Sequence, residues 1–282
     1  MRFEAIGVPW EIVTPEPLDE PVRDAVLARI DAYDRVWSRF RADSLVARIA
    51  REPGHWRLPP EAGPLLELYR VLYAVTAGRM SPLVGASLAR LGYDASLSLR
   101  PSGAALPAVT WEDAIAWDGE VLAAPRPVTI DIGAAGKGQL CDLVGEVLHQ
   151  HGVDSFLVDA SGDILRRGAG TIRVALEHPA DPSLAVGVAE LGDGSICASA
   201  TNRRAWADGV HHVLDATTGL PVHEIVATWA VAADAMTADG VATALFLAEP
   251  DAIPVALGVE WARITSAGRI EVSAGFPGEV FA

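Results

Sequence analysis

The chain contains a single lysine, Lys137, in the glycine-rich stretch "DIGAAGKGQL" at residues 131–140. All the remaining residues among its 22 Lys and Arg residues are arginines. An ammonium group is a compact cation, whereas guanidinium is a wide planar fork, and glycines let the backbone approach a ligand closely. The stretch therefore favours a contact between Lys137 and a phosphate oxygen. The alternative is that amino-acid usage in this protein favours arginine, and that the single lysine at 137 has no function of its own.

The stretch matches neither of the common phosphate-binding motifs. A P-loop would need glycine and Ser or Thr where Asp131 and Gly138 stand. The spacing also departs from the Rossmann fingerprint. Taken alone, it indicates only a strand followed by a helix whose first amide groups could hold an anion.

A second candidate site is the pair Asp239 and Thr243 in "DAMTADGVATALF", residues 234–246. The segment is expected to be helical, and residues four apart share one face of a helix. A carboxylate and a hydroxyl suit Mg²⁺, which takes hard oxygen ligands and retains water. The alternative is that Asp239 is simply an acid in a first helical turn.

The third cluster is "HHVLDATTGLPVH", residues 211–223. Neighbouring residues of a strand point to opposite faces, so at most one of His211 and His212 faces a given site. The alternative is an ordinary hairpin, because "TTGLP" is typical of a turn.

The composition narrows the functional class. The formal net charge of −15 argues against a nucleic-acid partner, since phosphate backbones bind basic surfaces. Cys141 and Cys197 are too few for a disulfide framework and are expected to be buried thiols of a reducing compartment. At 282 residues and 29.7 kDa, the chain can form one large domain or two small ones.

No membrane association is expected. The first residues lack a basic and then apolar leader, and they contain no lipidation cysteine. Asp234 and Asp239 interrupt the most apolar later window, which excludes a transmembrane helix. We expect a soluble, cytoplasmic protein.

The elements that must position these residues follow from hydrophobic periodicity. Helices are expected at 19–49, 63–78, within 80–94, 138–151 and 236–249. Strands are expected at 3–14, 110–117, 127–132, 154–160, 171–179, 185–199 and 225–233, with a hairpin at 261–276 turning at Ala267 and Gly268. These elements predict one α+β domain over residues 1–282, with a mixed or antiparallel sheet and packed helices.

In this order, the motifs resemble those of the FAD:protein FMN transferase family, the ApbE-like proteins. "DIGAAGKG" is similar to the family's D-[LI]-G-x-x-[AG]-K-G, "HHVLDATTG" to H-H-I-[IL]-D-P-x-T-G and "DGVATA" to D-A-x-x-T-[AG]. "DASGDI", "SATNRR", "WSRFRADSLVARI" and "GRMSPLVG" also resemble family motifs. The resemblance runs from about residue 3 to 276 and implies an α+β fold related to the T-fold.

The resemblance also implies a reaction and a set of roles. FMN would pass from FAD to a Thr or Ser hydroxyl of an acceptor flavoprotein, with Mg²⁺ at the pyrophosphate and AMP released. Lys137 would share the developing negative charge, and His212 would help deprotonate the acceptor. The implied metal ligands are the side chains of Asp239 and Thr243 and the backbone carbonyl of Ala134. The residues implied to bind FAD are Ile6, Phe40, Leu91, Gly92, Tyr93, Asp131, Lys137, Asp163 and Leu214.

Four positions depart from the family pattern, namely Ser81, Ser161, Asn202 and Ala216. They lie where the nucleotide or the acceptor would be held, so the resemblance leaves two further functions open. One is an FAD pyrophosphatase that yields FMN and AMP, and the other is a non-catalytic FAD-binding protein of the same fold.

Overall fold

The computed structural model describes residues 1–207 and 209–281, and the structural statements below concern these residues. They divide into two compact units, each built from separate stretches of the chain. Unit 1 comprises Met1–Asp31, Ala135–Arg203 and His223–Ala282, and unit 2 comprises Ala32–Ala134 and Arg204–Val222.

Unit 1 is organised around an eight-stranded sheet in which every neighbouring pair is antiparallel. Its order is β1-β2-β6-β7-β10-β15-β16-β17. The strands are β1 (Arg2–Ala5), β2 (Val8–Val13), β6 (Phe156–Asp159), β7 (Asp163–Arg167), β10 (Gly194–Ala200), β15 (Ile225–Ala232), β16 (Glu260–Thr265) and β17 (Ile270–Val272).

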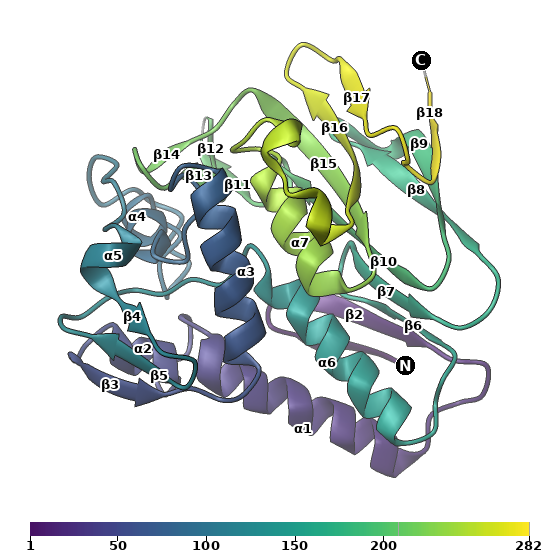
Figure 1. The fold of residues 1–282 in the computed structure, drawn as a ribbon, viewed down its shortest axis with the longest axis horizontal. Coiled ribbons are helices and arrows are strands. Elements are labelled where there is room, and N and C mark those ends of the chain that lie inside the picture. The colour runs from purple at the N-terminus through teal and green to yellow at the C-terminus, as the bar shows by residue number, and fades with distance from the viewer. Residues whose placement is uncertain (208, 282) are drawn as a thin grey trace. The chain divides into compact units, whose positions relative to one another are not determined.

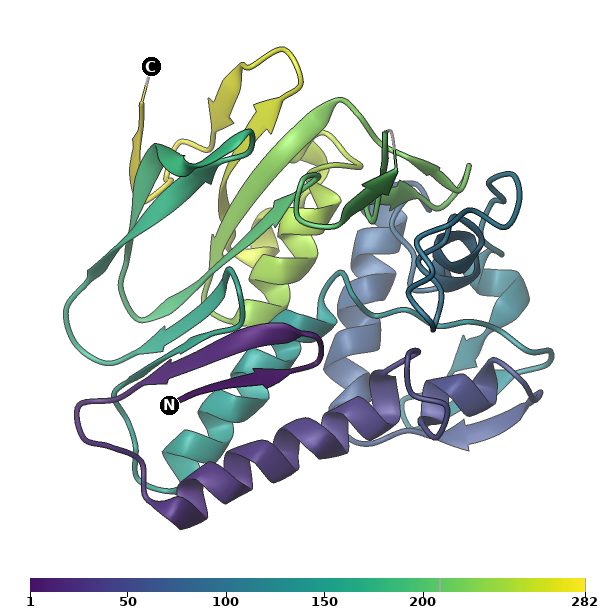
Figure 2. The same cartoon turned by 180° about the vertical axis from the view of Figure 1, so that it is seen from behind.

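Two helices, α6 (Gly136–Gln150) and α7 (Ala235–Ala244), lie on one face of this sheet and meet near their N-terminal ends (Figures 1 and 2). The alternation of side chains along the strands explains the contact. On β10 the Cys197 thiol reaches the Ala235 carbonyl at 3.4 Å, and on β15 the Thr228 hydroxyl donates to the Ala242 carbonyl at 2.7 Å. The sheet therefore fixes the position of α7.

The other face of the sheet packs against a second, three-stranded sheet. That sheet has the order β18-β9-β8 and consists of β8 (Ile172–His178), β9 (Asp181–Leu191) and β18 (Gly278–Val280). The apolar core between the two sheets comprises Leu176, Val186, Ala189, Leu191, Ile196, Ala227, Trp229, Ala262 and Ile264. Unit 1 also contains two short 3₁₀ segments, η1 (Pro250–Ala252) and η2 (Val255–Leu257).

Unit 2 is assembled from short elements. Helix α1 (Glu20–Trp37) begins in unit 1 and ends in unit 2. The other helices are α2 (Leu45–Ile49), α3 (Ala62–Val75), α4 (Gly85–Arg90) and α5 (Trp111–Ala114). One sheet has the order β3-β5-β4, and two further strand pairs are β11–β12 and β13–β14. The strands are β3 (Gly54–Arg57), β4 (Ala116–Trp117), β5 (Val121–Ala124), β11 (Ala205–Ala207), β12 (Val210–His211), β13 (Leu214–Asp215) and β14 (Leu220–Pro221).

The structure confirms the α+β class and corrects several elements. The helix expected over 19–49 is interrupted after Trp37, and α2 starts afresh because the Ser44 hydroxyl accepts the Ala47 amide at 3.1 Å. The strand expected at 3–14 is the hairpin β1–β2, with Ile6 and Gly7 in left-handed conformations, φ 47° and 78°.

Two predicted strands are wrong. The segment 110–117 forms α5 followed by the two-residue β4. The segment 127–132 forms no strand. Its Val128 and Asp131 amides donate to the Ile49 and Pro82 carbonyls, which belong to two separate segments rather than to one neighbouring strand. The segment 185–199, expected as one strand, forms most of β9 and β10, and these belong to different sheets.

The C-terminal hairpin was predicted correctly, with Gly268 at φ 81° in its turn.

No helix among the described residues is long and apolar enough to cross a membrane.

Candidate functional site

In unit 1, Lys137 is the second residue of α6, because the helix starts at Gly136, two residues earlier than expected. Its ammonium donates to the Ala160 carbonyl at 2.9 Å and lies 2.6 Å from Asp163 Oδ2. Burial alone would lower the Lys137 pKa, but the nearby carboxylates of Asp163 and Asp239 outweigh burial and raise it. Lys137 is therefore a fixed, fully charged cation.

The structure brings Asp239 into the same cluster. Its Oδ2 accepts the Gly138 amide at 3.0 Å, and only 4% of the residue is exposed. Burial and the neighbouring Asp163 raise the Asp239 pKa above its ordinary value. Asp163 is also fully buried, and its carboxylate is held by the ion pair with Lys137. Two buried carboxylates therefore lie close to one ammonium, and Asp239 holds a proton more readily than an ordinary carboxyl group.

This donor set fits a hard divalent cation. A bound cation would favour the ionised form of Asp239, and Thr243, one turn beyond Asp239 on α7, adds a hydroxyl oxygen. No group of three or more His, Cys, Asp or Glu side chains suited to a metal occurs in residues 1–207 and 209–281. A site built on Asp239 and Thr243 would accordingly rely on backbone oxygen and water for its other ligands, as Mg²⁺ sites commonly do.

The close packing of α6 on α7 holds these groups in place. A Cβ on Gly138 would lie 2.1 Å from the Ala235 carbonyl oxygen and 2.7 Å from Asp239 Cβ, so only glycine fits. From α6, Asp142 accepts the first two amides of α7, those of Ala235 and Met236, both at 2.8 Å. Burial raises the Asp142 pKa to about 7. The sequence-based candidates omitted Asp142, whose only signal was an acid inside a predicted helix.

In unit 2, Asp131 pairs with Arg39 and accepts the Gly133 amide at 2.8 Å. Burial would raise the Asp131 pKa, but the charge of Arg39 and the Gly133 bond lower it. Asp131 therefore stays ionised and fixes the start of the glycine-rich stretch. The next residue along, Ala134, donates its amide to the Tyr69 hydroxyl at 3.2 Å.

Several residues expected to bind the flavin form one aromatic and apolar cluster in unit 2. Phe40 meets Tyr93 edge to face at 5.5 Å between ring centroids, and Tyr93 stacks on Trp206 at 5.3 Å. Leu91 and Leu214 belong to the same apolar cluster. Gly92 has φ 103°, a conformation that other residues rarely adopt, so it is needed for this turn. Trp206 and Arg39 were missed by the sequence-based reasoning.

His212 is held as a neutral imidazole. Burial, together with the positive charge of Arg204, lowers its pKa to about 3. Its Nδ1 is buried and has no hydrogen-bond partner in the described part of the chain. The other histidine, His211, has its Nε2 2.8 Å from the Val222 carbonyl oxygen and so has a structural role. A neutral imidazole with an uncommitted ring nitrogen can accept a hydrogen bond from a ligand, while its low pKa makes it a weak base in this form of the protein.

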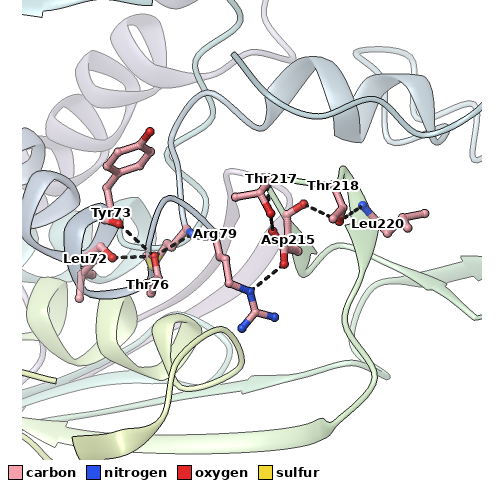
Figure 3. A network of polar contacts seen from close by, with 9 residues as sticks. Leu72, Tyr73, Thr76, Arg79, Asp215, Thr217, Thr218 and Leu220 are labelled. Atoms are coloured by element: carbon pink, nitrogen blue, oxygen red, sulfur yellow. Dashed lines mark hydrogen bonds and ion pairs between the residues drawn. The ribbon is translucent and has the colours of Figure 1, made fainter. Parts of the chain in front are cut away.

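A polar network anchors the hairpin that follows His212 (Figure 3). Asp215 accepts Arg79 Nε at 2.7 Å and the Thr217 amide and hydroxyl at 2.9 and 2.6 Å. Burial would raise the Asp215 pKa, but these hydrogen bonds lower it. Ala216, where the family has proline, donates its amide to the Arg79 carbonyl at 2.8 Å, a bond that proline could not make.

The other residues that differ from the family pattern also fit their local structure. Ser81 accepts the Leu83 amide at 3.2 Å, and Asn202 donates to the Pro179 carbonyl at 2.5 Å. Ser161, where the family has glycine, adopts φ 59° in the turn between β6 and β7. Ile6 lies in the β1–β2 turn of unit 1, and its part in a flavin pocket stays a prediction.

The sequence model of the ApbE family matches residues 6–263, a range that runs through both units. The chain belongs to the ApbE family. The resemblance drawn from the motifs is thereby confirmed.

Relatives of known sequence support this membership. The FAD:protein FMN transferase of Klebsiella pneumoniae is 27% identical over 271 residues, which cover 89% of this chain and 76% of that protein. The FAD:protein FMN transferase of Treponema pallidum is 28% identical over 257 residues, 79% of this chain and 70% of that protein.

Solved structures share the fold. The ApbE protein of Thermotoga maritima superposes with a TM-score of 0.84 at 21% identity and covers 99% of both chains. The flavin transferase ApbE of Vibrio cholerae gives a TM-score of 0.81 at 21% identity and covers 98% of this chain and 97% of its own.

Proposed function

We propose that this ApbE-family protein is an Mg²⁺-dependent FAD:protein FMN transferase. The observation that carries the proposal is the cluster of Lys137, Asp163 and Asp239, in which two buried carboxylates and one fixed ammonium adjoin the hydroxyl-bearing face of α7. Simple flavin binding does not require such a charge arrangement. The names of the relatives point to the same activity.

In the proposed reaction, an acceptor Thr or Ser hydroxyl oxygen forms a bond to the phosphorus of the FMN half of FAD. The pyrophosphate bond breaks and AMP leaves with the electron pair. Asp239 and Thr243 would hold Mg²⁺, together with the Ala134 carbonyl that the family resemblance implies, and the bound ion would supply charge neutralisation at the pyrophosphate. Positioning and charge neutralisation provide most of the catalysis in such phosphoryl transfers.

Each named residue has a defined task in this proposal. Lys137 is a small cation for a phosphate oxygen, and Asp163 fixes its ammonium. Gly138 orients the Asp239 carboxylate through its amide. His212 would take the proton of the acceptor hydroxyl on its neutral Nδ1. Its pKa of about 3 describes the protein without substrate, and the negative charge of bound FAD would have to raise it for this transfer. Asp131 holds the glycine-rich stretch in position.

The proposal is tested by following AMP release from FAD in the presence of Mg²⁺, with and without a candidate acceptor domain. We expect acceptor-dependent AMP release that is abolished by EDTA and strongly reduced in Asp239→Asn and Thr243→Ala. Asp193→Asn, at an exposed ion pair with Arg167, is the matched control and should retain activity.

Two alternative results would replace the proposal. AMP formed at the same rate without acceptor would identify an FAD pyrophosphatase. Bound FAD with no AMP under any condition would identify a flavin-binding protein without turnover.

A further inference from the structure

Arg39 carries a buried donor that the protein itself does not satisfy. Only 7% of its side chain is exposed, and its Nε is committed to the Asp131 carboxylate. Its Nη2 is buried and has no hydrogen-bond partner within the described residues. Leaving a charged-group donor unpaired in a protein interior is costly, so such a group indicates a ligand that completes it.

The surroundings of Arg39 define the shape of that ligand. The guanidinium carbon lies 4.3 Å from the centroid of the Phe40 ring and 5.0 Å from that of Tyr93. The two rings stand at 76° to each other and confine the guanidinium without pairing with Nη2, which can still donate along the guanidinium edge. Phe40 is 41% exposed and offers an open aromatic surface beside this donor. A planar heteroaromatic ring with an acceptor on its edge matches both features.

The local charge also bears on the choice of acceptor. Asp131 neutralises Arg39 directly, and an aromatic surface is a poor environment for a phosphate. Arg204 adds a further positive charge near Asp131, which would favour a phosphate. The experiment below therefore also measures the binding of a phosphate-containing ligand. A ring carbonyl is uncharged and accepts one hydrogen bond. The neutral pair of Arg39 and Asp131, with Nη2 as its remaining donor, matches this requirement.

We infer that Arg39 binds the isoalloxazine ring of FAD by donating from Nη2 to a carbonyl oxygen of its pyrimidine edge. This inference rests on the proposed function, because that function makes FAD the substrate. Arg39 was not among the candidate site residues predicted from the sequence, although it lies directly before Phe40 in the stretch "WSRF".

The test compares Arg39→Lys with the wild-type protein. Lysine keeps the positive charge opposite Asp131 but lacks the second prong of the guanidinium. We expect riboflavin and FAD to bind about tenfold or more weakly, the effect of losing one hydrogen bond to a charged group, while ADP affinity is unchanged. Riboflavin affinity is measured by fluorescence and ADP affinity by calorimetry. Arg41→Gln, two residues away in surface pairs with Asp34 and Asp43, is the control and should bind riboflavin normally.

A second measurement does not depend on the variant folding. In the wild-type protein, a hydrogen bond from Arg39 should shift a carbonyl stretching band of bound riboflavin to lower wavenumber. Unshifted carbonyl bands, or unaltered riboflavin affinity in Arg39→Lys, would overturn the inference while FMN transfer by the wild type leaves the proposed function standing. Weaker ADP binding with normal riboflavin binding would instead assign Arg39 to a phosphate. A wild-type protein that binds neither riboflavin nor FAD would refute both proposals.

Discussion

At the scale of single residues, the ammonium of Lys137, the one lysine of the sequence, is held by two partners. Its ammonium fits between the Ala160 carbonyl and Asp163, and only 17% of the side chain is exposed. In Lys137→Arg the charge is kept, but the planar fork cannot occupy the same point. We predict a folded protein whose AMP release falls roughly 100-fold, the order of loss for one misplaced donor to a developing anion.

The measurement is steady-state AMP release together with a thermal denaturation curve. Arg173→Lys, an exposed position on β8, makes the reverse exchange where no site is proposed and should change neither quantity. If Lys137→Arg turned over FAD at the wild-type rate, Lys137 would be a structural residue only.

The lowered pKa of His212 leads us to predict that the free energy of unfolding depends on pH. Its folded-state pKa of about 3 lies below the ordinary value of 6.5, so protonation favours the unfolded chain. The stability that neutral His212 supports is complete above pH 6.5 and is lost as the pH falls towards 3. At pH 5 the loss amounts to about 2 kcal/mol.

Chemical denaturation of the wild type and His212→Gln at pH 7 and pH 5 measures this contribution. The wild type should lose about 2 kcal/mol more than the variant between the two pH values. Equal losses in both proteins would show that His212 keeps its ordinary pKa in the folded state, which contradicts its burial as a neutral imidazole.

At the scale of elements, the site in unit 1 depends on how closely α6 packs on α7. In Gly138→Ala the added Cβ would meet the Ala235 carbonyl oxygen at 2.1 Å and move Asp239. We predict a loss of about 3 kcal/mol in unfolding free energy, typical of overpacking, and a higher Mg²⁺ requirement for AMP release.

Gly63→Ala supplies the matched helical control. A Cβ on Gly63 in α3 would meet no atom within 4 Å, so alanine should be neutral or stabilise the protein by about 0.5 kcal/mol. Wild-type stability and wild-type Mg²⁺ dependence in Gly138→Ala would contradict the proposed role of the α6–α7 contact.

The same elements show what the sequence could and could not predict. Amphipathic periods located α3, α6 and α7, and β-branched runs located β15 and the C-terminal hairpin. The segment 127–132 has a strand-like composition, but its amides bond to isolated carbonyls of distant loops, which no local pattern reveals. The break after Trp37 depends on the Ser44 cap, a weak signal inside an otherwise helical stretch.

The candidate site was predictable to the extent that residue type and spacing carried chemistry. Lys137, Asp163 and Asp239 were named from motifs, and the fold brings them together. Arg39 and Asp142 were missed because their roles depend on partners far away in the sequence. Arg39 pairs with Asp131, and Asp142 accepts the Ala235 amide.

At the scale of the whole molecule, family membership and site chemistry agree. The ApbE match over residues 6–263 covers both units, and the fold is retained at about 21% identity to solved ApbE structures. Changes at Ser81 and Ala216 preserve local hydrogen bonding. The charged cluster around Lys137 is intact, so we predict that the ability to cleave FAD is retained.

The measurement that tests the central claim most directly is the intact mass of an acceptor domain after incubation with this protein, FAD and Mg²⁺. We predict one added FMN on a single Thr or Ser, visible as a fluorescent band in a denaturing gel, with an equal amount of AMP in solution. Replacing the acceptor hydroxyl by alanine should remove both the band and the AMP. An acceptor of unchanged mass in the presence of continuing AMP release would contradict the transferase assignment.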